Sequence, residues 1–235
     1  MSRLVFVRHA QASLFSADYD MLSERGHSQA KQLADFWTDQ GLTVDALYTG
    51  PCRRHRETAE YVEAQCDRNG IAVTAMPEFD ENQVDRLITQ HMDTVSAEFP
   101  HVAQLHREFR DADEDTRQPA FSRMFLEVAG LWTSGRCVRP GVETAVEFRE
   151  RVNAGVDQIV DRADPGQLIV VVTSVGPIAA VLQRALHCSD SITVDIGWRI
   201  RNCSVTEFVF GDSRFTLDCF NSLAHLDDRQ DWTYW

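Results

Sequence analysis

A short apolar run near the start of the chain ends abruptly in two polar residues. Residues 4–7 read LVFV, and Arg8 and His9 follow directly. A short run of β-branched and aromatic residues with a polar break is typical of a buried strand. In open α/β sheets the carboxyl ends of strands face the ligand crevice, where an arginine beside a histidine would suit an anion next to a nucleophile or base. The alternative interpretation is a strand that ends in two solvated residues.

Strands and helices are expected to alternate in the first third of the chain. The apolar patterns predict strands over residues 44–48 and 71–76 and helices over residues 26–40 and 53–69. Ser23 is expected to be the N-cap of the first helix, and Gly41 is expected to follow its end. The resulting β-α-β-α-β order favours a largely parallel sheet covered by helices.

The pattern changes at about residues 82–138, where no run predicts a strand. Helical periodicity covers residues 84–98, 102–112 and 121–132, with loops expected near Pro100 and over residues 113–119. Because the sheet resumes afterwards, we expect one domain over residues 1–235 with a helical insertion. The insertion is expected to cover the carboxyl edge of the sheet.

The last third of the chain supplies the remaining strands. Residues 168–173, LIVVVT, form the strongest buried-strand run, with helices expected over residues 145–162 and 178–186. Two further runs, at residues 203–210 and 214–220, flank Gly211-Asp212-Ser213 and predict a hairpin with at least one antiparallel strand. The expected fold is therefore a three-layer α/β/α sandwich with a mostly parallel sheet.

Composition and charge exclude several classes of function. The formal net charge of −13 argues against general affinity for nucleic acid or anionic membranes, so a phosphate site must be a local basic pocket. The six cysteines are scattered without a CxxC pair, which disfavours disulfides and zinc and favours a reducing cytoplasm. No apolar segment approaches the roughly 20 residues that span a bilayer. The eight histidines form no HxH or HxxxH pair, so neither a metal nor another cofactor is expected.

Three predicted strands end in polar residues or a tight turn. The first ends at Arg8-His9, the second at Thr49-Gly50-Pro51, and the strand over residues 168–173 ends at Ser174. The helix after the second strand opens with Arg53 and Arg54. Parallel strands bring such ends to one edge of the sheet, and arginines there with helix N-termini favour a dianionic phosphate. The spacing alone therefore favours phosphoryl chemistry.

Five stretches, in order, carry a family resemblance. RHAQ at residues 8–11 resembles the RHG signature of the histidine phosphatase superfamily, which includes the phosphoglycerate mutases, with Ala10 at the glycine position. Residues 22–30 are similar to LTxxGxxQA, and residues 48–59 are similar to SSPLxRxxQTA. Residues 170–178 are similar to the strand and turn with the second family histidine, and residues 221–226 are similar to NxxxHL. The resemblance covers most of the chain except the central insertion.

The resemblance implies a role for each matching residue. His9 would be the nucleophile that becomes phosphohistidine, and Arg8 and Arg54 would bind the phosphoryl oxygens because a guanidinium matches phosphate geometry. Gln11 would also contact the phosphate. Glu81 would be the general acid that protonates the leaving oxygen, with Glu78 as the alternative assignment.

One departure bears directly on catalysis. Ser174 stands where the family has its second histidine, and Val175 replaces the glycine that follows. Loss of one oxyanion donor typically lowers the rate by about 10²–10³-fold. The first hypothesis is therefore a phosphatase that hydrolyses a small phosphomonoester, with reduced activity. A second is an impaired member that binds phosphorylated ligands or protein partners, and a third, weaker one is mutase-type phosphotransfer.

Two further expectations concern residues outside these motifs. His55, one position after Arg54, is expected to be a surface histidine. The aromatic residues at the end of the sequence, Trp232, Tyr234 and Trp235, are expected to pack on the domain or on a second copy of the chain in a homodimer.

Overall fold

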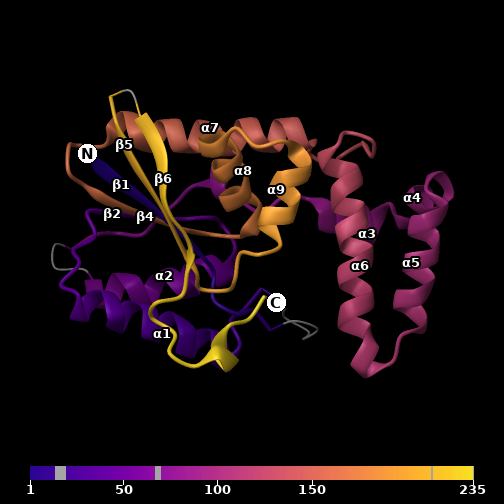
Figure 1. The fold of residues 1–235 in the computed structure, drawn as a ribbon, viewed down its shortest axis with the longest axis horizontal. Helices are drawn as coiled ribbons and strands as arrows, with labels where there is room; N and C mark the ends of the chain where they lie inside the picture. The colour runs from indigo at the N-terminus through magenta and orange to yellow at the C-terminus, as the bar shows by residue number, and fades with distance from the viewer. Residues whose placement is uncertain (14–19, 67–69, 213, 235) are drawn as a thin grey trace.

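A six-stranded sheet with the order β3-β2-β4-β1-β5-β6 forms the centre of the protein (Figure 1). The computed structural model describes residues 1–13, 20–66, 70–212 and 214–234. The strands are β1 (Ser2–Arg8), β2 (Ala46–Thr49), β3 (Thr74–Ala75), β4 (Leu168–Thr173), β5 (Val205–Gly211) and β6 (Arg214–Ser222). β1 to β4 are mutually parallel, whereas β5 pairs antiparallel with both β1 and β6. The expected mostly parallel sheet with an antiparallel edge is confirmed.

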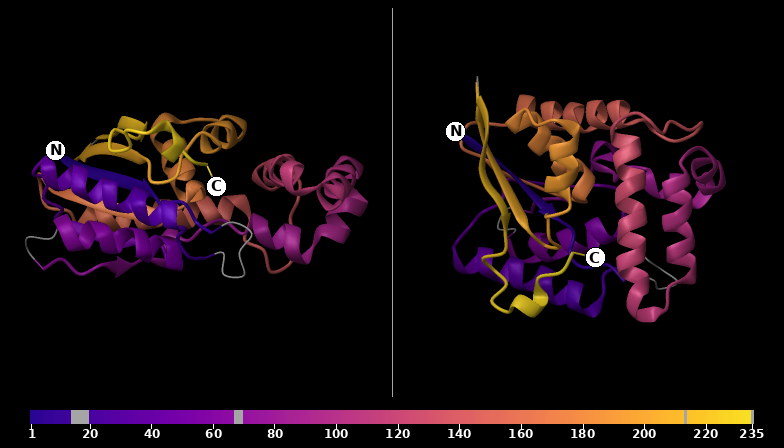
Figure 2. Two further views of the ribbon diagram at one scale, coloured as in Figure 1. Left: turned by 90° about the horizontal axis from the view of Figure 1, so that it is seen from below. Right: turned by 45° about the vertical axis from the view of Figure 1, so that its right-hand side comes forward.

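Helices cover both faces of this sheet (Figure 2, left). The helices beside the sheet are α1 (Glu24–Asp39), α2 (Arg53–Cys66), α7 (Ala145–Arg162) and α8 (Val175–Leu186). Side chains of β1 alternate between two cores: Val5 and Val7 pack with α1 and α2, whereas Leu4 and Phe6 pack with α7 and α8. This alternation produces the predicted α/β/α layers.

Local hydrogen bonds explain several helix starts. Ser23 caps α1, as predicted, because its side chain accepts a hydrogen bond from the Gly26 amide. Thr144 and Glu147 form a reciprocal capping box at the start of α7. Gly41, predicted to follow α1, has a φ of 67°, the left-handed region that glycine favours after a helix.

Four helices lie between β3 and α7. They are α3 (Val84–Gln90), α4 (Met92–Glu98), α5 (Pro100–Asp111) and α6 (Glu114–Thr133). The single helix expected over residues 84–98 is wrong, since the backbone breaks at His91. The loop expected over residues 113–119 is also wrong: the Asp113 carboxylate accepts from the Thr116 amide and starts α6 before Pro119.

Other boundaries differ from the sequence expectation. β3 shortens to two residues, both exposed. α8 begins at Val175, so Pro177 lies in its first turn, where a missing amide hydrogen costs little. A further helix, α9 (Asp190–Gly197), was not expected; it packs against α8 and α6. The predicted helix end at Asn69, the hairpin residue Ser213 and the terminal Trp235 lie outside the described residues.

The C-terminal segment is fastened to the edge of the fold near α1. The Arg201 guanidinium lies 5.1 Å from the ring centres of both Trp232 and Tyr234. The Asn202 amide donates to the Thr233 carbonyl oxygen at 2.9 Å. These two aromatic residues therefore pack on the domain itself. Within the described parts of the chain, no helix is long and apolar enough to cross a membrane.

Truncation of a core aromatic residue is expected to test the packing of β5. Phe208 is 0% exposed and meets Phe6 edge to face. Phe208→Ala should lower the free energy of unfolding by about 3–5 kcal/mol in urea denaturation, because it loses apolar burial and leaves a cavity. Phe220→Ala, on the neighbouring strand at 38% exposure, is the control and should change it by less than about 1 kcal/mol. Equal effects of the two variants would contradict this packing.

Candidate functional site

The ends of three parallel strands meet at one edge of the sheet. The pairing aligns Arg8 with Thr173 and Thr49 with Val172. The His9 amide continues this ladder, donating to the Thr173 carbonyl oxygen at 2.7 Å. His9 and Ser174 are therefore the first residues beyond two neighbouring strands, as the sequence predicts.

His9 is held in a form suited to nucleophilic attack. It is buried, and its Nδ1 lies 2.8 Å from the Ala10 carbonyl oxygen. A carbonyl oxygen can only accept, so Nδ1 carries the proton and Nε2 keeps its lone pair. Burial, followed by the positive charges of Arg54 and Arg8 and then by His55, lowers the pKa of His9 well below its usual value. The imidazole is therefore neutral near neutral pH.

Two buried arginines place positive charge beside His9. The Arg8 guanidinium donates to the carbonyl oxygens of Ile200 at 2.6 Å and Tyr234 at 2.7 Å. Arg54, in the first turn of α2, donates to the Asp20 carboxylate at 2.7 Å and to Ser174 Oγ at 3.3 Å. These contacts fix both guanidinium groups in a cavity that His9 also lines. Sequence reasoning had not identified Asp20 or the two carbonyl oxygens.

Glu81 enters the same cavity from the turn after η1 (Pro77–Phe79). Its Oε1 accepts from the Gly176 amide at 3.2 Å and from Asn82 Nδ2 at 2.6 Å. A Cβ at position 176 would lie 2.1 Å from that oxygen, so only glycine allows the approach. Burial raises the pKa of Glu81 above its usual value, although hydrogen bonds from Asn82 and Gly176 and the charges of Arg54 and Arg8 oppose the shift. A raised pKa suits a proton donor.

Hydrogen bonds from neighbouring elements fasten the turn that carries Glu81. Arg151 of α7 donates to the backbone carbonyl oxygens of Pro77, Glu78 and Asp80. Thr173 Oγ1 donates to the Phe79 carbonyl oxygen at 2.6 Å, which links the turn to β4. The Asp80 carboxylate accepts from the Glu81 amide at 2.8 Å. Glu81 is therefore held by side chains from three parts of the chain.

Two other sequence candidates face elsewhere. Glu78, the alternative acid, accepts from Gln158 Nε2 on α7 and does not line the His9 cavity. Gln11, two residues after His9, lines a neighbouring pocket instead. Its Oε1 accepts from Ser23 Oγ at 3.0 Å. The phosphate contact expected of Gln11 stays a prediction.

The surface position expected for His55 is wrong. Its side chain is 0% exposed, and its Nε2 lies 2.7 Å from Ser174 Oγ. The ring centres of His55 and His9 are 5.6 Å apart. Position 55 lies on the face of α2 that turns towards β4, so helix geometry buries it. Burial and the charge of Arg54 lower the pKa of His55 well below its usual value.

The cavity beside His9 has a volume of about 670 Å³ and is lined by both charged and apolar side chains. Arg8, Arg54 and Glu81 line the part with His9, which is called the polar end below; Arg86, Arg149 and Gln183 also line the cavity. Its remaining walls are mostly apolar, and the aromatic side chains among them are Phe121, Phe125, Trp132, Phe148, Trp198 and Tyr234. Because α6 supplies three of these six aromatic residues, the insertion covers this edge of the sheet, as expected.

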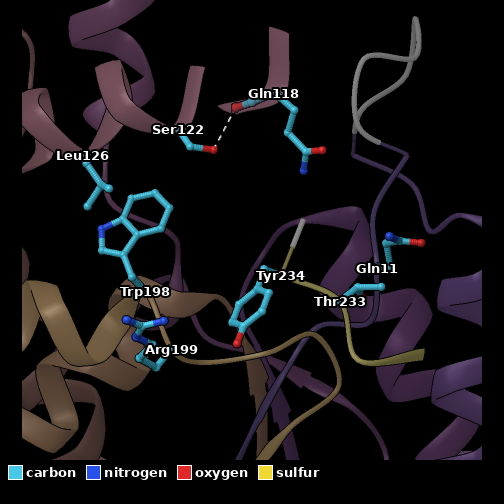
Figure 3. Close-up of a pocket in the computed structure, with 8 residues that line it drawn as sticks. All are labelled: Gln11, Gln118, Ser122, Leu126, Trp198, Arg199, Thr233 and Tyr234. Carbon is cyan, nitrogen blue, oxygen red and sulfur yellow. Dashed lines mark hydrogen bonds between the residues drawn. The ribbon is translucent and has the colours of Figure 1, made fainter. Parts of the chain in front are cut away.

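A second pocket of about 540 Å³ adjoins the first (Figure 3). Trp198 and Tyr234 line both pockets. Figure 3 shows the Trp198 ring beside Leu126 of α6, with Tyr234 between Trp198 and Thr233. The C-terminal segment and the insertion thus face each other across the approach to His9.

Among residues 1–13, 20–66, 70–212 and 214–234, no group of three or more histidine, cysteine, aspartate or glutamate residues is placed to hold a metal ion. Burial raises the pKa of the nearby Cys52 thiol to about 12, so it remains protonated. A neutral imidazole, two cations and a buried carboxyl are the groups available at the polar end of the cavity.

Known structures share this architecture. A mycobacterial glucosyl-3-phosphoglycerate phosphatase in complex with inorganic phosphate has a TM-score of 0.64 and 23% identity, covering 96% of this chain and 99% of that one. YhfR of Bacillus stearothermophilus has a TM-score of 0.68 and 16% identity, with coverages of 96% and 99%. Phosphoserine phosphatase of Entamoeba histolytica in complex with 3-phosphoglyceric acid has a TM-score of 0.64 and 15% identity, with coverages of 96% and 99%. At these identities the likeness establishes the fold alone.

Sequence comparison identifies the family. No curated protein matches the chain significantly. The family model of the histidine phosphatase superfamily, branch 1, matches residues 4–223. Because this match spans nearly the whole sequence, the chain belongs to the histidine phosphatase superfamily.

Proposed function

We propose that the protein is a phosphatase that hydrolyses a small phosphomonoester through a phosphohistidine on His9. The observation that carries the proposal is the neutral His9 imidazole, whose Nδ1 faces the Ala10 carbonyl oxygen and leaves Nε2 for attack. Arg8 and Arg54 flank it with positive charge, and Glu81 lines the same cavity. Two of the similar structures described above carry the name phosphatase, which supports hydrolysis over binding alone.

The proposed reaction has two balanced steps. In the first, His9 Nε2 attacks phosphorus, the ester P–O bond breaks, and Glu81 gives its proton to the leaving oxygen. In the second, water attacks the phosphohistidine, the P–N bond breaks, and Glu81 takes back a proton from the water. Arg8 and Arg54 stabilise charge on the phosphoryl oxygens in both steps.

The apolar walls of the cavity favour a substrate with an apolar or aromatic alcohol part. A phosphoryl group at the polar end would leave the alcohol part among aromatic side chains such as Phe121, Phe125 and Trp132. Each buried methylene group contributes about 0.8 kcal/mol to binding. Highly hydroxylated alcohols gain less there because their hydroxyl groups lose water.

Replacement of the nucleophile tests the central proposal. The protein incubated with a ³²P-labelled aryl phosphate and quenched in alkali should carry an acid-labile label on His9. His9→Ala should carry none, since the attacking nitrogen is gone, while His187→Ala, at an exposed position after α8, should label normally. If wild-type protein binds the ester but never forms the label, the impaired binding protein becomes the better description. Transfer of the label to a second alcohol rather than to water would indicate a mutase.

The acid role of Glu81 predicts a specific change in the pH profile. The group must be protonated to act, and its pKa is raised, so kcat should fall as pH rises through that raised pKa. Glu81→Gln should lower kcat by about 10²–10⁴-fold for alkyl esters and remove this alkaline limb. Glu78→Gln is the matched control and should leave the profile unchanged. An alkaline limb that survives in Glu81→Gln would assign it to another group.

The apolar cavity predicts a preference along a series of alkyl phosphates. Hexyl phosphate should have a kcat/KM at least about tenfold higher than ethyl phosphate, because the longer chain buries more apolar surface. Phe125→Ala should reduce this ratio, since it removes part of the wall. Phe220→Ala, outside the cavity, should not. Equal kcat/KM for the two esters in the wild-type protein would rule out the apolar subsite.

A further inference from the structure

His55 is a buried titratable side chain that the mechanism above does not use. It does not line the His9 cavity, and it lies in contact with Ser174 Oγ through Nε2 at 2.7 Å. Its ring centre is nevertheless only 5.6 Å from that of His9. A fully buried imidazole this close to a nucleophile needs a physical explanation.

The space around the imidazole is closed by two small residues. A Cβ at position 50 would lie 2.4 Å from His55 Nδ1 and 2.4 Å from the Phe79 carbonyl oxygen. Gly50 is therefore the residue that leaves room for the ring on one side. On the other side stands Ser174, whose short side chain lets Nε2 approach within hydrogen-bond distance. Glycine at 50, histidine at 55 and serine at 174 fit together as one packed unit.

The hydroxyl of Ser174 has two inward neighbours. A serine hydroxyl has one proton to donate and two lone pairs. Arg54 Nη2, which always carries protons, donates to one lone pair at 3.3 Å. A neutral His55 has a single N–H, and Nδ1 faces the Gly50 backbone, which hydrogen-bonds to the ring and so holds that proton on Nδ1, as Ala10 does for His9. Nε2 therefore keeps its lone pair and accepts the Ser174 hydroxyl proton at 2.7 Å, while Oγ accepts from Arg54.

We propose that His55 is a positioning residue: its Nε2 accepts the Ser174 hydroxyl proton and so turns an Oγ lone pair towards Arg54 Nη2, which holds the Arg54 guanidinium beside His9. The proposal rests on the phosphoryl site proposed above and deepens it. The resemblance implies a histidine at position 174, at the end of β4. In this chain an imidazole from α2 acts there through the Ser174 hydroxyl. No proton is transferred; the imidazole fixes the direction of a hydrogen bond.

Binding of orthovanadate, a mimic of phosphoryl transfer, tests the proposal without requiring turnover. Ser174→Ala should weaken vanadate binding about tenfold to hundredfold, because a hydrogen bond to a charged group is lost. His55→Ala should weaken it by a large part of that factor. In the Ser174→Ala background, however, His55→Ala should change the dissociation constant less than about twofold, because the two residues act through one hydroxyl. Equal effects of His55→Ala in both backgrounds would overturn the proposal.

Two further variants separate positioning from packing. His55→Gln keeps an acceptor, the side-chain amide oxygen, that can reach Oγ, so it should retain vanadate affinity within about threefold of wild type. His55→Leu fills similar space without an acceptor and should behave like His55→Ala. If folded His55→Leu binds vanadate as tightly as wild type, the hydrogen bond has no role. Circular dichroism melting confirms that each variant is folded, and His187→Ala serves as the surface control.

An exchange of the two side chains provides a reciprocal test. Ser174→His alone should disrupt the site, because the new ring would enter the space that His55 occupies. The double variant His55→Ala/Ser174→His removes that conflict and should bind vanadate more tightly than either single variant. A double variant no better than Ser174→His would contradict the inference. The two proposals can fail separately. If the effects of His55→Ala and Ser174→Ala on vanadate binding are coupled as expected but the wild-type protein forms no phosphohistidine, the proposed activity is refuted and the role of His55 remains.

Discussion

The parallel pairing of β1 with β4 is the contact on which the site depends. It aligns Arg8 with Thr173, so the next residues, His9 and Ser174, leave the sheet together. A slip of one residue would exchange the faces of every side chain on β1 and move Leu4 and Phe6 out of their core. The apolar side chains that stabilise the sheet therefore also fix the position of the nucleophile. Stability and placement of His9 have the same cause.

The charged side chains Arg8, Arg54 and Glu81 at this edge each have specific hydrogen-bond partners. Carbonyl oxygens of Ile200 and Tyr234 hold the Arg8 guanidinium, and the Gly176 amide supports the Glu81 carboxyl. A buried charge without such partners would cost several kcal/mol. The first turn of α8 thus donates a hydrogen bond to Glu81. The sequence had suggested that helix N-termini at this edge would contact the phosphate directly. The chain as a whole has a formal net charge of −13, but Arg8 and Arg54 place positive charge at this edge.

The sequence predicted those features that short apolar runs and caps determine. The strand before Arg8-His9, the cap at Ser23 and the hairpin near Gly211 all follow from local patterns. The break at His91 and the early start of α6 were missed because helical periodicity continues across them. Burial of His55 was missed for a different reason. It depends on Gly50 and Ser174, which lie elsewhere in the sequence and become neighbours only when α2 packs against β4.

The sequence does contain a signal for the burial of His55, in the residues at positions 50 and 174. Relative to the family pattern, position 50 has lost a serine side chain and position 174 has lost an imidazole. Two losses of volume at strand ends that meet at one edge imply either a cavity or a compensating larger residue nearby. Position 55 lies in the first turn of the helix that follows Gly50, and a histidine there is the right size to fill the gap. Departures from a family pattern are therefore more informative when they are considered together: the volume missing at Gly50 and Ser174 is where the side chain of His55 lies.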